Sequence, residues 1–172
     1  ALDGDFPDYL KKLYTKVTGQ LSLIVYEVEN DLDAGGIFET MNDRGKPLTE
    51  LDKVKNYLLY VCSKLDIADG ARMDLAAKIN RAWTRIFEEL TAAGLSDDNN
   101  ENQLLRNHWL MAYDYNANNW AQSRTIKDTF NLRSYEGRHV ELAKKLGQYV
   151  DTLHMAVGAY CDVIRPTRTN AF

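Results

Sequence analysis

Five residues whose side chains or backbone could bind a nucleotide occur within one short stretch, residues 37–58. They are Asn42, Arg44, Gly45, Asp52 and Lys55. Asn42 and Arg44 can donate hydrogen bonds to phosphate oxygens, and the free N–H groups at the start of a helix also attract anions. A carboxylate such as Asp52 or Glu39 could hold a Mg²⁺ ion that bridges phosphates. The stretch therefore predicts one half of a nucleotide site, because no Gly-rich phosphate loop accompanies it.

A helix, a sharp elbow and a second helix must position these residues. Apolar side chains at helical spacing predict a helix over residues 37–41, and Gly45 can adopt the left-handed conformation that ends it. Pro47 then imposes an extended link. Thr49 starts the second helix, with Asp52 three residues later as in a capping box. A purely structural interpretation, in which these residues only cap helices, stays open beside the nucleotide site.

The residues before the elbow predict one helix and one strand. Pro7 lies in the first turn of the helix, which Gly19 ends. Residues 21–28 (LSLIVYEV) are rich in β-branched and aromatic side chains, which favours a strand. A lone strand cannot satisfy its own backbone hydrogen bonds. We therefore expect it to pair with another copy of the chain, as in a homodimer, or with residues outside this sequence.

The rest of the chain predicts a helical bundle. After a break at residues 68–70, apolar side chains recur with a helical period in four segments. These segments are residues 73–90, 104–112, 126–132 and 139–164. A polar loop at residues 96–101 precedes the second segment, for which Asp98 or Asn99 is the expected cap. The expected fold is thus mainly α, with one short orphan strand.

Composition narrows the possible functions. Hydrophobic residues make up 45% of the 172 residues, which is typical of a globular protein. The net charge of −4 argues against binding of nucleic acid through bulk positive charge. A nucleic-acid scaffold stays open as a weaker option, through the basic residues Arg81, Arg85, Arg106, Lys144 and Lys145. Cys62 and Cys161 are expected to be reduced thiols of a cytoplasmic protein, and no apolar run is long enough to span a membrane.

The three histidines give no catalytic or metal signal. His108, His139 and His154 lack Cys or acidic partners at the spacing of metal ligands. His108 lies beside Trp109 at helical spacing, so we expect it to pack at the edge of the core. The sequence therefore assigns no catalytic residue and no metal ligand.

The stretch around the elbow resembles a known family. The spacing of Phe38, Asn42, Gly45, Leu48, Asp52 and Lys55-Asn56 is similar to the second signature of the GmrSD-type restriction endonuclease N-terminal domain, long called a domain of unknown function. Residues 102–111 (NQLLRNHWLM) resemble the Leu-Arg-x-x-Trp helix of that family. The predicted strand and the closing helix also fit, so the resemblance covers nearly the whole chain.

The resemblance implies a ParB/sulfiredoxin-like core that binds and hydrolyses a nucleoside triphosphate with Mg²⁺. Such a core is coupled to an HNH-type nuclease domain, in the same chain or in a partner. The assembly cleaves modified foreign DNA, as in phage defence. By this resemblance Asn42 and Gly45 lie at the nucleotide pocket, and Asp52 and Lys55 lie on the helix behind it.

Two departures from the family limit what we expect of this chain. The first signature, Asp-Gly-Gln-Gln-Arg, and the nuclease part are not in the sequence. We therefore expect residues 1–66 to be the C-terminal part of a nucleotidase-like core and residues 67–172 its helical extension. The chain alone should hold no cofactor and hydrolyse no nucleotide. The alternative is a non-enzymatic helical module that binds a protein partner.

Overall fold

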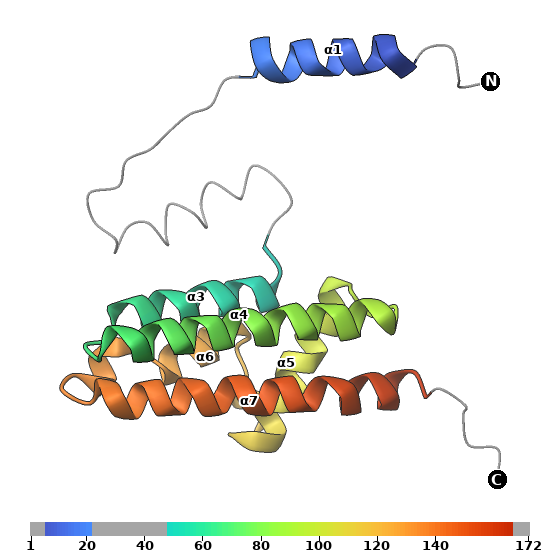
Figure 1. Cartoon of the computed structure of the whole chain (residues 1–172). Helices are drawn as coiled ribbons and strands as arrows, with labels where there is room; N and C mark the ends of the chain where they lie inside the picture. Colours follow the sequence, from blue (N-terminus) through green and yellow to red (C-terminus); the bar gives the residue numbers. More distant parts are fainter. Residues whose placement is uncertain (1–5, 22–47, 167–172) are drawn as a thin grey trace. The chain divides into compact units, whose positions relative to one another are not determined.

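The computed structural model describes residues 6–21 and 48–166, and the regular structure in these ranges is helical (Figure 1). The elements are α1 (Phe6–Gly19), α3 (Glu50–Lys64), α4 (Asp69–Ala92), α5 (Asp98–Ala112), η1 (Ala117–Asn119), α6 (Ser123–Thr129), η2 (Leu132–Tyr135) and α7 (His139–Ile164). The prediction of a mainly helical chain is confirmed. Residues 22–28 of the expected strand lie outside the described residues, so the strand and the ParB-like core stay predictions.

The chain divides into two units, residues 1–34 and 35–172. In the first unit, α1 runs from Phe6 to Gly19, as its proline and its terminal glycine predict. In the second, α3 shares one hydrophobic core with α4, α5, α6 and α7. The expected domain boundary after residue 66 stays a prediction.

The largest interface joins α4 and α7, which run parallel and side by side (Figure 1). Near the middle of both helices, Lys78 Nζ lies 2.6 Å from an Asp151 carboxylate oxygen. Near their C-terminal ends, the Cys161 thiol donates to the backbone carbonyl of Glu89. The two pairs are separated by nearly the same sequence offset, 73 and 72 residues, so the two helices keep their register between these contacts.

Apolar side chains from five helices fill the core between these elements. Val54, Leu58 and Val61 of α3 are fully buried, as their helical spacing predicts. Trp83 of α4 is also fully buried, and its indole N–H donates to the backbone carbonyl of Leu51 at 3.0 Å. This bond satisfies the only polar atom of the largest buried side chain, so it fixes how α3 lies on α4.

An aromatic cluster joins α5 and α7 to Phe130 at the end of α6. Trp109 and Tyr113 of α5 stack at 4.7 Å between ring centroids. Tyr149 of α7 is fully buried and lies 5.3 Å from both the Phe130 ring and the His108 ring. Stacked and edge contacts of this kind add to the stabilisation that apolar burial provides.

Three local expectations were wrong. The break before α4 falls at residues 65–68, and α4 already begins at Asp69 with Ala68 before it. Met73 is 72% exposed, because the buried side of α4 follows Leu75 and Ile79 instead. The cap of α5 is Asp97, whose carboxylate accepts from the Asn100 N–H at 3.0 Å.

Asp97 caps α5 because a carboxylate at this position reaches the N–H three residues on. Asp98, the expected cap, lies inside the first turn, where its negative charge interacts favourably with the helix dipole. The expected helical segment 126–132 is divided in the structure, since α6 ends at Thr129 and η2 begins at Leu132. The closing helix spans residues 139–164, and both Cys62 and Cys161 are free thiols, which confirms the prediction of reduced cysteines.

Candidate functional site

The described part of the predicted nucleotide half-site is the first turn of α3. Thr49 Oγ1 accepts a hydrogen bond from the Asp52 N–H at 3.1 Å. In return, the Asp52 carboxylate accepts from the Thr49 N–H at 3.3 Å and from its hydroxyl at 3.1 Å. The predicted capping box is therefore confirmed. Asn42, Arg44 and Gly45 lie outside the described residues, and their place in the site stays a prediction.

Asp52 and Lys55 lie one turn apart on α3, so their side chains share one side of the helix. Both are half-buried. The structure brings Asp52 together with Thr49 and gives its carboxylate a positioning role at the start of the helix. Lys55 follows the fully buried Val54 at the border of the buried side.

Glu50 is a residue of this turn that sequence reasoning missed. One of its carboxylate oxygens lies 2.8 Å from Lys53 Nζ, and the other accepts from the Ser123 N–H at 2.9 Å. Burial raises the pKa of Glu50, but these hydrogen bonds outweigh it, so the pKa lies below its usual value. No local signal predicts this contact, because Ser123 is far away in sequence.

The described residues alone do not form a complete nucleotide or Mg²⁺ site. The two carboxylates in the first turn of α3 are already bonded to Thr49, Lys53 and Ser123. Across residues 6–21 and 48–166, no group of three or more His, Cys, Asp and Glu side chains could hold a metal ion. This turn can therefore supply at most one side of such a site.

His108 and Thr152 are the pair whose distance is closest to that of a catalytic base and nucleophile. The imidazole Nε2 lies 2.9 Å from the Thr152 hydroxyl oxygen. However, that hydroxyl donates to the backbone carbonyls of Gln148 and Tyr149, as a helical threonine does. Burial also lowers the pKa of His108 to about 4, which makes it a weak base at neutral pH. The pair joins α5 to α7, and the expected packing role of His108 is confirmed.

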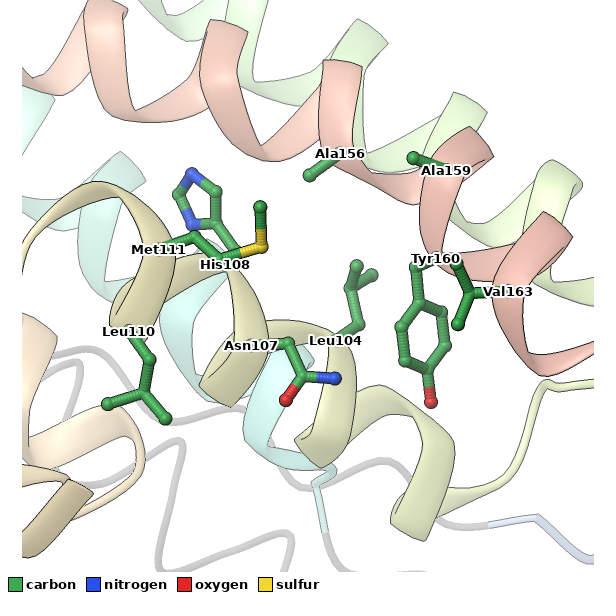
Figure 2. Close-up of a pocket in the computed structure, with 9 residues that line it drawn as sticks. All are labelled: Leu104, Asn107, His108, Leu110, Met111, Ala156, Ala159, Tyr160 and Val163. Atoms are coloured by element: carbon green, nitrogen blue, oxygen red, sulfur yellow. The ribbon is translucent and has the colours of Figure 1, made fainter. Parts of the chain in front are cut away.

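An apolar groove with a volume of about 380 Å³ lies between α5 and α7 (Figure 2). Its lining residues are Leu104, Asn107, His108, Leu110, Met111, Ala156, Ala159, Tyr160 and Val163. Met111 and Val163 at its rim are 87% and 78% exposed. Sequence reasoning missed this groove, because two helices distant in the chain form it and neither helix alone shows it.

Comparison with family models, with curated proteins and with solved structures finds no match to this chain. The resemblance to GmrSD-type domains therefore rests on the sequence pattern alone. In the ranges that the structure describes, no helix is long and apolar enough to cross a membrane.

Proposed function

We propose that this chain is part of a nucleotide-dependent, modification-dependent DNA restriction protein that acts in phage defence. It contributes part of a nucleoside triphosphate site and a helical scaffold. One observation carries the proposal: the two segments that resemble the family are far apart in sequence but lie on packed helices. The second signature ends on α3, and the Leu-Arg-x-x-Trp segment places Leu105 and Trp109 of α5 in the same core.

In this proposal the capping box fixes where α3 begins, and the first turn presents its N–H groups to a phosphate. Asn42, Arg44 and Gly45 contribute from the preceding residues, and Lys55 adds positive charge. Lys53 balances the charge of Glu50, since the two form an ion pair. The other wall of the site and the HNH-type nuclease domain come from the same protein or from a partner in the cytoplasm.

Nucleotide titration tests this proposal in a protein that carries both signatures. Asn42→Ala and Lys55→Ala should each weaken binding of Mg²⁺·ATP or Mg²⁺·GTP by about tenfold, the loss of one charge-assisted contact. Lys144→Ala, which removes an exposed lysine of α7, is the matched control. Helix content should stay constant by circular dichroism. Unchanged affinity in both test variants would show that Asn42 and Lys55 do not bind the nucleotide and have only a structural role.

The isolated chain provides a second test of the same proposal. It should show no metal-dependent nucleotide hydrolysis, because it holds only one side of the site. Measurable turnover by this chain would contradict the proposal that it holds only one side of the nucleotide site.

The groove between α5 and α7 favours a second candidate, a non-enzymatic helical module that binds protein. Its apolar lining and the exposed Met111 and Val163 are typical of interaction surfaces. A second copy of the chain is the partner that can be tested directly. Sedimentation of the wild type and of a Met111→Lys, Val163→Lys variant should then differ in self-association, with equal thermal stability.

A further inference from the structure

Two side chains of α3 hold α6 at both of its ends. At the N-terminal end, the Glu50 carboxylate accepts from the Ser123 N–H at 2.9 Å. At the C-terminal end, the Tyr57 hydroxyl lies 3.0 Å from the carbonyl oxygen of Lys127 and 3.2 Å from that of Phe130. Glu50 and Tyr57 are about two turns apart, so they project from the same side of α3.

These bonds matter because α6 cannot be stable by itself. It has seven residues, and helices much shorter than about 12 residues are marginal in water. Its N-cap residue, Gln122, makes no side-chain capping bond. Glu50 supplies that cap from α3, with a negative charge that favours the helix N-terminus. Tyr57 supplies the donor for carbonyls at the other end.

The backbone at Gln122 opposes this arrangement. Gln122 has φ 56° and ψ −141°, and it is the only non-glycine residue with positive φ in the described ranges. A side chain is strained in this region of backbone conformation, which suits glycine. The turn into α6 therefore stores strain that opening of the segment would release.

Besides the bonds of Glu50 and Tyr57, burial of apolar side chains holds α6 in place. Ile126 is fully buried and Phe130 is 1% exposed, and the Phe130 ring contacts Tyr149 of α7. By contrast, α4 and α7 are long helices that pack along their whole length. The segment that carries α6 thus has fewer independent supports than the interface between α4 and α7.

We infer that α6 is a strap that opens from α3 as a unit while α4 and α7 stay folded, with Glu50 and Tyr57 as its two latches. Opening exposes Ile126, Phe130 and the side of α3 that they cover. Any change that draws the Glu50 carboxylate away from Ser123 loosens the strap. Glu50 also lies in the first turn of α3, but this inference does not require that a nucleotide binds there.

Hydrogen exchange of the full chain, followed by NMR at single amides, tests the strap. In the wild type, amides of residues 126–130 should exchange faster than those of Ile79, Trp83 and Val150. Glu50→Ala should speed exchange at residues 126–130 by at least about tenfold and leave the other three unchanged. Asp151→Ala is the matched control, since it also removes a carboxylate paired with a lysine.

Two further variants and one control keep the test decisive if Glu50→Ala perturbs the fold. Tyr57→Phe should also speed exchange at residues 126–130, whereas Tyr60→Phe should not. Gln122→Gly should slow it, because glycine relieves the strain of the closed turn. Exchange at residues 126–130 that always matches that of α4 and α7 would overturn the strap, and so would faster exchange in Gln122→Gly.

Discussion

The Nε2 atom of His108 lies 2.9 Å from the Oγ1 atom of Thr152, and this contact joins α5 to α7 inside the core. Because the Thr152 hydroxyl donates to backbone carbonyls, its oxygen accepts, which assigns the ring proton to Nε2. Nδ1 is buried and has no hydrogen-bond partner among the described residues. The ring is therefore held neutral, and burial lowers its pKa to about 4.

Acid should weaken the fold through His108. An unfolded chain protonates this residue below pH about 6.5, whereas the folded chain resists protonation until about pH 4. The stabilisation is complete above pH 6.5 and is lost as the pH falls through this window, by up to about 3 kcal/mol. Urea unfolding of the wild type at pH 7 and pH 4.5 measures the loss.

His108→Gln is the comparison for this prediction, because glutamine can donate to Thr152 but does not titrate. The difference in unfolding free energy between wild type and variant should shrink as the pH falls. A difference that stays constant across the window would contradict the prediction, whatever the other carboxyl groups contribute.

Removal of the capping box should destabilise the start of α3. Thr49→Ala should lower the unfolding free energy by about 1 kcal/mol, because the Asp52 N–H loses its acceptor. Thr49→Ser keeps the hydroxyl and should restore most of it. Thr84→Ala, in the middle of α4, is a control expected to be neutral or slightly stabilising, since alanine favours helices. Chemical denaturation distinguishes these outcomes.

Alanine substitution should change the unfolding free energy in opposite directions at Gly70, in the first turn of α4, and at Gly94, just after its C-terminal end. Gly94 has φ +65°, and a Cβ there would lie 2.9 Å from the Arg165 guanidinium. Gly94→Ala should lower the unfolding free energy by about 1 kcal/mol. Gly70 lies in the first turn of α4 with open space around it, so Gly70→Ala should raise it by up to about 1 kcal/mol. Equal signs in thermal unfolding would contradict the conformational explanation.

The hydroxyl groups of Tyr149 and Tyr57 should contribute differently to the unfolding free energy. The Tyr149 hydroxyl is buried, and the described residues offer it no hydrogen bond. Tyr149→Phe should therefore leave the unfolding free energy within about 1 kcal/mol of the wild type or raise it. Tyr57→Phe removes a donor from two carbonyls and should lower it by about 1 to 2 kcal/mol. The same substitution thus tests both environments by denaturation.

Most of the helical fold could be predicted from local sequence, because helices depend on apolar spacing and caps. The ends of α7 and the capping box of α3 illustrate this. The errors arose where two local signals competed. Asp97, Asp98 and Asn99 can all cap a helix, and only the geometry of the turn selects Asp97. Met73 is apolar, but it lies one position away from the row of buried residues on α4.

The candidate site was less predictable, since its contacts join distant segments. The bond between Glu50 and Ser123 and the groove between α5 and α7 depend on how the helices pack. No local pattern contains that information. The pattern around Thr49 correctly predicted Asp52 as a capping partner, and its nucleotide role stays a prediction because three of the five expected residues lie outside the described ranges.

The parallel arrangement of α4 and α7 also constrains how this chain folds. The contacts between Lys78 and Asp151 and between Cys161 and Glu89 join segments that are distant in sequence. A bundle of antiparallel neighbours can grow by adding each helix to the one before it. Here the largest interface closes only after the intervening helices have crossed back over the bundle, so a loop of high entropic cost must close first. We expect slower folding than for an up-and-down bundle of equal length, with the pairing of α4 and α7 as the late step.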